Sequence, residues 1–299
     1  MSSKKYFAIV GSVLCATGIL FTQLSYGQAI PFKIIVSPNP AGVAIGGIDG
    51  THAGTQQFTA IELNVDGSIN SKPNLIWTSS NQAVATLATE GSQFALATGV
   101  ESGTTIITAK DVVYPNIYNS VTLTVHKIGD AVAIGNNSGL VYCMGTGTDI
   151  TNCVYLPPGK IGGVISPENN SVSALWWNSF YSQTNAISPN DGATNTKLIA
   201  AQPEFLSSYA AGVCQAVGPN WYLPAISELK VMVKNEIALN NQGNANLTPN
   251  GYWSSTEFTT EPGVVNYTDA YAMYVDFYSG FQSFDLKYDN HHVRCVHYL

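Results

Sequence analysis

"NWYLPAISEL" (residues 220–229) joins two aromatic residues and a proline to the start of a predicted helix. Pro224 precedes that helix, at a point where its missing N–H costs little. Trp221 and Leu223 would bury the hinge before it, so we expect the stretch to be scaffold. Apolar residues recur at steps of three and four along 225–239, which predicts one buried helix face: Ile226, Leu229, Val233 and Ile237.

Glu228 lies in the first turn of that helix. A carboxylate there is favoured by the helix dipole and accepts hydrogen bonds from local donors. We therefore expect a capping role for Glu228, not one as a general acid.

The segments around this stretch predict a domain of mixed structure. Another helix is expected at 203–218, where Gly218 and Pro219 would end it. Strands are expected at "GYWSST" (251–256), "AYAMYVDF" (270–277) and "HHVRCVHYL" (291–299). Helices flanked by strands at both ends indicate an α+β domain, which we assign to residues 128–299.

Residues 30–127 follow a different pattern, in which short alternating runs are separated by Gly, Pro, Asn and Asp. No segment with a helical period interrupts them, so the pattern predicts an antiparallel β-sandwich. Trp77 is expected in its core. The expected strands are "FKIIVSP" (32–38), "QQFTAIEL" (56–63), "NLIWTSS" (74–80), "FALATG" (94–99), "TTIITA" (104–109) and "VTLTV" (121–125).

Residues 1–29 are typical of a secretory signal peptide. Two lysines precede an apolar run over 7–21, and small residues allow cleavage after Gly27 or Ala29. The run is shorter than the ~20 apolar residues of a spanning helix. We expect an exported protein without a membrane span, secreted or displayed on a bacterial surface.

The chain is acidic, with a formal net charge of −7. Residues 30–127 contain four lysines against six acids, and residues 128–299 contain five lysines and one arginine against thirteen acids. No basic stripe is present to displace counterions from a polyanion, which argues against nucleic acid as a partner.

Four cysteines follow the expected signal peptide: Cys143, Cys153, Cys214 and Cys295. An even number in an exported chain predicts disulfides, and four cysteines allow three pairings. All four lie in the second domain, so covalent cross-linking is expected there alone.

The first domain resembles bacterial immunoglobulin-like domains of group 2. The matching residues are "IWTSSNQAVATL" (76–87), "ATGVESGTTIITA" (97–109) and "VTLTV" (121–125). The resemblance implies an all-β immunoglobulin-like sandwich that spaces or presents a neighbouring domain.

The second domain resembles the C-terminal domain of Lcl-type collagen-like adhesins, which implies a C-type-lectin-like fold. No Gly-X-Y repeat precedes it, so collagen-driven trimerisation is not expected, and the oligomeric state stays open. The matching residues are "IGD" (128–130), "GATNTKLI" (192–199), "YAAGVCQ" (209–215), "NWYLPAISEL" (220–229), "GYWSST" (251–256), Gly280, Lys287 and "VRCV" (293–296).

The resemblance also implies the disulfide pairing. Cys214 and Cys295 match family positions on elements that lectin-like folds tie together. Cys143 and Cys153 are then left to each other, across a short glycine-containing loop.

The long polar segment 240–270 is the first candidate binding region, because long loops in compact domains are often functional. Its carboxylate and amide oxygens suit hydroxyl groups or calcium, although the EPN-type sugar motif is absent. The sequence therefore does not decide whether this segment binds calcium, and no other cofactor is expected. The candidate contacts are Glu257, Glu261, Asn266, Tyr267 and Asp269.

"ALWWNSFY" (174–181) is the second candidate region. Adjacent strand residues face opposite ways. Trp176 matches the family position and is expected in the core, so Trp177 is expected at the surface, where it would stack on a sugar. Tyr181 is a further candidate contact.

"DNHHVRCVH" (289–297) contains three histidines, and in one strand His291, Cys295 and His297 would share a face. A zinc site needs three or four converging ligands. Cys295 is assigned to a disulfide, so no metal site is expected.

No nucleophile elbow, zincin motif or P-loop is present, so no catalytic residue is expected. The leading interpretation is an adhesin-like binding protein whose immunoglobulin-like stalk presents a lectin-like domain to a glycan or surface protein. One alternative is an enzyme of the formylglycine-generating type, which shares the lectin-like fold and uses reactive cysteines. The other is a structural envelope protein that binds nothing small.

Overall fold

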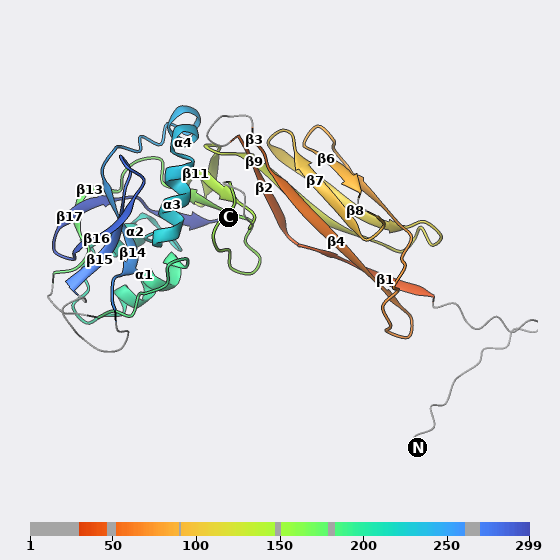
Figure 1. Cartoon of the computed structure of the whole chain (residues 1–299), viewed down its shortest axis with the longest axis horizontal. Coiled ribbons are helices and arrows are strands. Elements are labelled where there is room, and N and C mark those ends of the chain that lie inside the picture. Colours follow the sequence, from red (N-terminus) through yellow and green to blue (C-terminus); the bar gives the residue numbers. More distant parts are fainter. Residues whose placement is uncertain (1–29, 47–51, 90, 147–150, 179–182, 261–269) are drawn as a thin grey trace, which may run out of the picture.

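The computed structural model describes residues 30–46, 52–89, 91–146, 151–178, 183–260 and 270–299. The expected signal peptide at 1–29 lies outside these residues. Two lobes lie end to end along the long axis of the molecule (Figure 1). Among the described residues, no helix is both long and apolar enough to cross a bilayer.

The described residues of the first lobe form nine strands: β1 (Pro31–Ser37), β2 (Ala41–Gly46), β3 (His52–Ala53), β4 (Thr55–Asn64), β5 (Leu75–Ser79), β6 (Ala85–Thr89), β7 (Phe94–Gly99), β8 (Gly103–Asp111) and β9 (Tyr118–Lys127). They form two sheets, in the orders β1-β4-β7-β6 and β3-β2-β9-β8-β5. The inward side chains of both sheets share one apolar core, which includes Phe58, Ile107 and Leu123.

The six strands expected in this lobe are present, and β2, β3 and β6 are additional. The strands of this lobe pair antiparallel, as expected, except that β2 pairs with β9 in parallel. Trp77 is buried at 7% exposure, and its Nε1–H donates to the carbonyl of Ser92 at 2.9 Å.

The second lobe is an α+β domain with nine strands and four helices among the described residues. Its strands are β10 (Ala131–Ile134), β11 (Asn137–Met144), β12 (Gly162–Ile165), β13 (Ser171–Leu175), β14 (Gly251–Glu257), β15 (Tyr271–Asp276), β16 (Gln282–Leu286), β17 (Asn290–Val293) and β18 (Val296–Tyr298). Its helices are α1 (Gly192–Ala200), α2 (Ala210–Val217), α3 (Ile226–Lys234) and α4 (Glu236–Gly243).

The strands of this lobe form two sheets, in the orders β10-β11-β12-β18 and β13-β17-β14-β15-β16. The helices pack beside the sheets around a single apolar core (Figure 1). The largest fully buried apolar side chains there are aromatic: Trp176, Trp177, Trp253, Tyr142, Tyr209 and Tyr252.

The helices differ from those expected from the sequence. The helix expected at 203–218 is shorter and begins at Ala210, and α1 was not expected. The helix expected at 225–239 divides at Asn235 into α3 and α4. Ile237 is therefore 56% exposed instead of buried.

The strand expected at 291–299 is also divided. β17 pairs with β13 and β14, whereas β18 pairs with β12 in the other sheet. The residues between them, Arg294 and Cys295, are fully buried and join the two sheets.

Both disulfides implied by the family resemblance are present. Cys214 of α2 is bonded to Cys295, and Cys143 of β11 is bonded to Cys153. The first ties a helix to the turn between the sheets, and the second closes a local loop.

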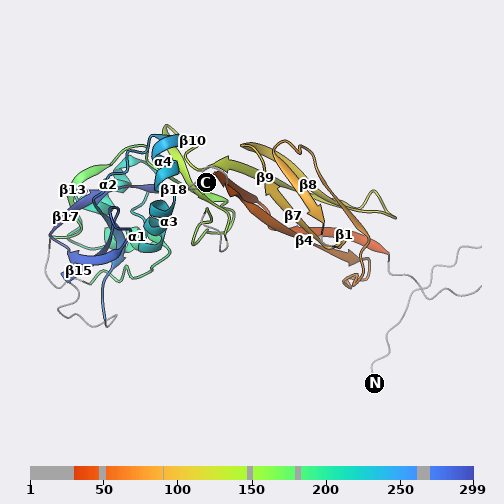
Figure 2. The same ribbon diagram turned by 45° about the horizontal axis from the view of Figure 1, so that its top comes forward.

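The two lobes meet around β2, which is buried along its whole length. Its residue Ala44 packs in the core of the second lobe. The amide of Ile128 donates to the carbonyl of Ile45 at 3.0 Å, and Ser102 Oγ donates to Asp130 Oδ2 at 2.6 Å. Both views show the lobes in contact here, beside the C-terminal end (Figures 1 and 2).

Candidate functional site

Four of the candidate contacts in the 240–270 segment, together with Tyr181, lie outside the described residues. The four are Glu261, Asn266, Tyr267 and Asp269. Their predicted roles, including calcium binding, stay predictions.

Trp177 is not at the surface. It is 1% exposed, and its ring packs against Tyr209 at a centroid distance of 5.0 Å. The alternation argument fails because β13 ends at Leu175. Beyond that point the amides of Trp176 and Trp177 both donate to the carbonyl of Lys287 at 2.9 Å. Trp176 is buried as expected, at 1%.

Glu257 is also inaccessible to a ligand, because it is 3% exposed at the end of β14. Its carboxylate forms an ion pair with Lys287, whose side chain is likewise fully buried. Thr184 donates to the same carboxylate through its amide, at 2.9 Å from Oε2, and through its hydroxyl. Lys287 Nζ lies 5.0 Å from the ring centroid of Trp176. This buried pair anchors the second lobe, so the expected ligand contact is wrong.

The histidines near the C-terminal end do not converge. His291 packs against Trp253, and its Nε2 lies 3.0 Å from Asp285 Oδ2, whereas His297 packs against Trp221. The described residues contain no group of three or more His, Cys, Asp or Glu side chains arranged to hold a metal ion.

A cleft of about 810 Å³ opens beside the 220–229 stretch, and we call it the central cleft. Its walls come from α1, from the end of α2, from β18 and from a ridge at residues 155–161. Its polar and aromatic lining residues are Tyr155, Lys160, Asp191, Thr194, Thr196, Lys197, Gln215, Asn220, Trp221, Tyr222, His297 and Tyr298.

The 220–229 stretch is thus more than scaffold. Trp221 and Leu223 are buried at 3% and 0%, as expected of a hinge. Asn220, Trp221 and Tyr222 nevertheless contribute atoms to the wall of the central cleft. Trp221 therefore belongs both to the hinge and to the cleft wall.

The central cleft is locally basic within an acidic domain. Lys160 and Lys197 are exposed at its rim, and its one carboxylate, Asp191, is engaged in capping α1. Asp191 Oδ1 accepts from the amide of Thr194 at 2.9 Å. Burial lowers the pKa of His297, so the two lysines supply the positive charge at neutral pH.

Glu228 lies directly behind the floor of the central cleft, at 1% exposure. Its Oε2 accepts from the amide of Ala225 at 2.7 Å and from that of Gly192 at 3.2 Å. Its Oε1 accepts from the hydroxyl of Tyr222 at 2.8 Å. The expected capping role is confirmed, and the carboxylate also connects α1, α3 and the cleft floor.

Burial raises the pKa of Glu228 to about 7, because desolvation outweighs these hydrogen bonds. The hydroxyl of Tyr298 lies 3.4 Å from Oε1. Burial and the charge of Glu228 also raise the pKa values of Tyr222 and Tyr298. The cleft floor is therefore a rigid cluster of protonated phenols around one carboxyl group.

Sequence reasoning missed three lining residues: Tyr155 and Lys160 lie in a segment without a motif, and Lys197 lies in "GATNTKLI", which was used only for the family resemblance. One signal was available: residues 128–299 contain only five lysines, and two of them line one cleft.

Residues 169–297 match the family model of the Lcl C-terminal domain. The chain therefore carries an Lcl C-terminal domain, as the motifs of the second lobe indicated. No curated protein is similar enough to this chain to count as a relative.

Several solved structures show weaker similarity. Domains 4 and 5 of the S-layer protein SbsC share 22% identity at a TM-score of 0.26, covering 33% of this chain and 46% of that one. A fimbrial protein from Bacteroides ovatus ATCC 8483 shares 13% identity at a TM-score of 0.38, covering 88% of this chain and 70% of that one.

The C-terminal domain of ZirS shares 14% identity at a TM-score of 0.25, covering 42% of this chain and 87% of that one. The chain covers less than two thirds of the S-layer structures it matches, at 46%, 20% and 62%. TM-scores this low do not establish a common fold.

Proposed function

We propose that this protein is an exported, surface-displayed or secreted binding protein of the adhesin type. In this proposal an immunoglobulin-like first lobe presents a lectin-like second lobe to a glycan or to a protein on another surface. The protein has no enzymatic role in this proposal.

The central cleft is the observation that carries the proposal. Its volume of about 810 Å³ falls within the ~300–1,000 Å³ of typical ligand sites. Aromatic edges, amides, hydroxyls and two lysines line it, which suits a ligand rich in hydroxyl groups. The Lcl C-terminal domain at residues 169–297 supports the assignment to an adhesin-like class.

The disulfides argue against the enzyme alternative. A formylglycine-generating enzyme relies on reactive thiols, whereas Cys143, Cys153, Cys214 and Cys295 are all bonded in pairs. A titration that found free thiol in the native exported protein would favour the enzyme instead.

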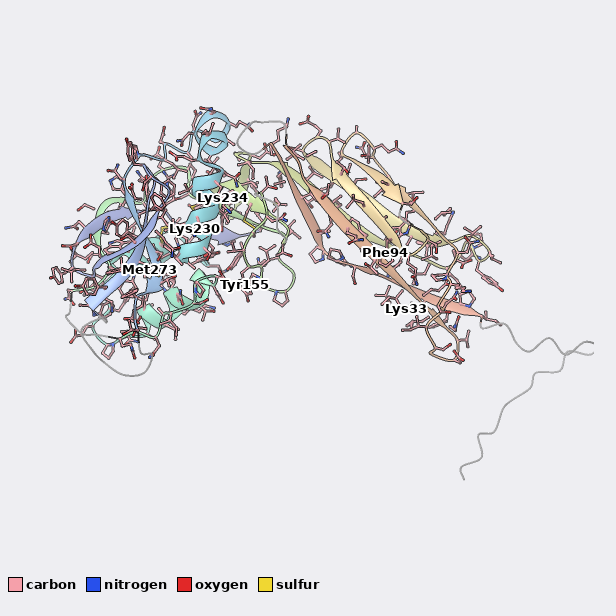
Figure 3. All side chains as sticks on the ribbon, viewed as in Figure 1. Lys33, Phe94, Tyr155, Lys230, Lys234 and Met273 are labelled. Carbon is pink, nitrogen blue, oxygen red and sulfur yellow. A yellow bond between two sulfur atoms is a disulfide. The ribbon has the colours of Figure 1, made fainter. Side chains whose placement is uncertain are left out.

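The test is binding of the whole chain to a glycan array and a surface-protein array, each with calcium and with chelator. We expect saturable binding that Lys197→Ala weakens about tenfold, the effect of losing one hydrogen bond from a charged group. Lys234→Ala is the matched control, since Lys234 is an exposed lysine of α3 that does not line the central cleft. Figure 3 shows it on α3, apart from Tyr155 of the ridge.

Two results would overturn the proposal. One is the absence of binding on both arrays, and the other is binding that Lys160→Ala and Lys197→Ala leave unchanged. Loss of binding with chelator alone would add a calcium site to the proposal.

A further inference from the structure

The central cleft adjoins a second hollow on the second lobe. This turn cleft, of about 580 Å³, is lined by the β10–β11 turn on one side and by the end of α2 on the other. The two clefts share four lining residues: Gly218, Pro219, Trp221 and His297. Because these residues line both hollows, the two clefts are neighbours, and we call the set of adjoining clefts the groove.

The central cleft also adjoins a hollow that residues of both lobes line. This junction cleft, of about 430 Å³, shares Pro157 and Lys160 of the ridge with the central cleft. Its opposite wall belongs to the first lobe, with Pro38, Pro40 and Gln56 among its residues. Tyr155 of the ridge lies on the side of the second lobe that faces the first (Figure 3).

We propose that the turn, central and junction clefts together bind one linear oligosaccharide, and that the first lobe supplies part of the site. This inference rests on the proposed function and names its ligand class. It also gives the first lobe a direct role in recognition, beyond that of a stalk.

The size of the groove favours a chain over a compact ligand. Each hollow by itself has the volume of a site for one small molecule. Three adjoining hollows, of which each neighbouring pair shares lining residues, fit a ligand made of repeated small units.

The chemistry of the walls favours a saccharide over a peptide. Peptides often bind by adding a strand to a sheet edge, which requires free backbone N–H groups. The junction cleft is instead lined by Pro38, Pro40, Pro157 and Pro158, none of which has an N–H to offer. Side-chain amides and a lysine supply the hydrogen-bonding groups there: Asn39, Gln56 and Lys160.

The fixed position of the lobes makes a shared site workable. An ideal Cβ at Gly42 would lie 2.6 Å from the carbonyl oxygen of Ile161, and one at Gly145 would lie 2.7 Å from that of Gly42. The backbones of β2 and the ridge therefore approach too closely for any side chain between them. Both walls of the junction cleft are held by this contact.

The experiment measures how affinity depends on chain length. The whole chain is titrated with linear cello-, xylo-, chito- and hyaluronan oligosaccharides of two to ten units. We expect affinity for the preferred series to rise over several units and then level off. We expect Gln56→Ala to weaken the longest oligomers about threefold to tenfold, the effect of one lost hydrogen bond, and to leave the disaccharide unchanged.

Gln57→Ala is the matched control, because Gln57 is the exposed neighbour of Gln56 on β4 and does not line the junction cleft. Hydrogen exchange with the longest bound oligomer should show protection in both lobes, at 38–42 and at 155–161.

The outcomes separate this inference from the proposed function. Saccharide binding that is independent of length, or unaffected by Gln56→Ala, would overturn the shared groove and leave the function standing. Binding of extended peptides in place of every saccharide series would overturn the ligand class. Failure to bind anything on the earlier arrays would overturn the function itself.

Discussion

Glu228 shows how one buried side chain connects stability to pH. Its carboxyl group is fully enclosed and accepts hydrogen bonds from Ala225, Gly192 and Tyr222. Burial nevertheless raises its pKa from 4.5 to about 7. The folded state therefore holds this proton more tightly than the unfolded state does.

We predict that Glu228 lowers the stability of the protein as pH rises from about 4.5 to 7. In that window the folded state binds more protons than the unfolded state, so the free energy of unfolding falls, by about 3 kcal/mol in all. Glu228→Gln should remove this decrease, which urea unfolding at a series of pH values would measure. Glu204→Gln, at an exposed position, is the control and should show the same fall in the free energy of unfolding as the unmodified protein. If Glu228→Gln also shows that fall, Glu228 is not its source.

A second prediction concerns the buried ion pair of Glu257 and Lys287. Glu257→Ala leaves the ammonium of Lys287 buried without its carboxylate, so we expect a loss of about 3–5 kcal/mol in the free energy of unfolding. Glu204→Ala should change it by less than about 0.5 kcal/mol. Equilibrium unfolding in urea compares them, and a loss under 1 kcal/mol for Glu257→Ala would show that the pair is not an anchor.

At the same scale, sequence reasoning was right where a side chain's role is local. The cap at Glu228 and the burial of Trp77 follow from position in a helix or strand, whereas the burial of Trp176 was expected from the family resemblance. Trp177 was misplaced because the end of β13 depends on backbone hydrogen bonds to Lys287, which lies more than a hundred residues away. Sequence periodicity contains no information about such a partner.

Helix and strand boundaries likewise depend on contacts with distant parts of the chain as well as on local sequence. Asn235 interrupts the helix expected at 225–239, and its side-chain amide donates to the carbonyl of Tyr142 in β11 at 3.2 Å. Tertiary contacts of this kind override helix propensity, which is a weak local preference. β17 and β18 likewise separate because they pair with different sheets. The central cleft was not predicted, since its walls come from four separate segments.

The disulfides provide a prediction at the scale of elements. Cys214 and Cys295 are 81 residues apart, whereas Cys143 and Cys153 are 10 apart. In the chain-entropy model, removing the first bond by Cys214→Ala/Cys295→Ala costs about 4–5 kcal/mol, and removing the second costs about 3 kcal/mol. Urea unfolding under non-reducing conditions would measure both, and a larger loss for the short loop would contradict the ordering.

For the whole molecule, the contact of β2 with the ridge fixes the arrangement of the lobes. The two-domain organisation with its boundary near residue 127 was predicted from composition and pattern. The burial of β2 against the second lobe was not predicted, because no strand was expected at the position of β2.

We predict that Gly42→Leu separates the lobes, because its side chain would collide with the backbone of Ile161. Small-angle X-ray scattering should show a larger radius of gyration, while the circular dichroism spectrum stays that of the folded protein. Ser37→Leu, at an exposed position of β1, is the control. An unchanged radius in Gly42→Leu would mean that the lobes are held elsewhere.

The position of Leu299 has a practical consequence. Its amide donates to the carbonyl of Gly162 at 2.8 Å, which places it beside the junction of the lobes, whereas strand β1 lies at the far end of the first lobe (Figure 1). Any tag or polypeptide joined after Leu299 would emerge next to the groove and crowd it. Attachment to a sensor or bead through the N-terminal side leaves the groove open to solvent. An assay immobilised through the other end would report weak binding for a reason unrelated to affinity.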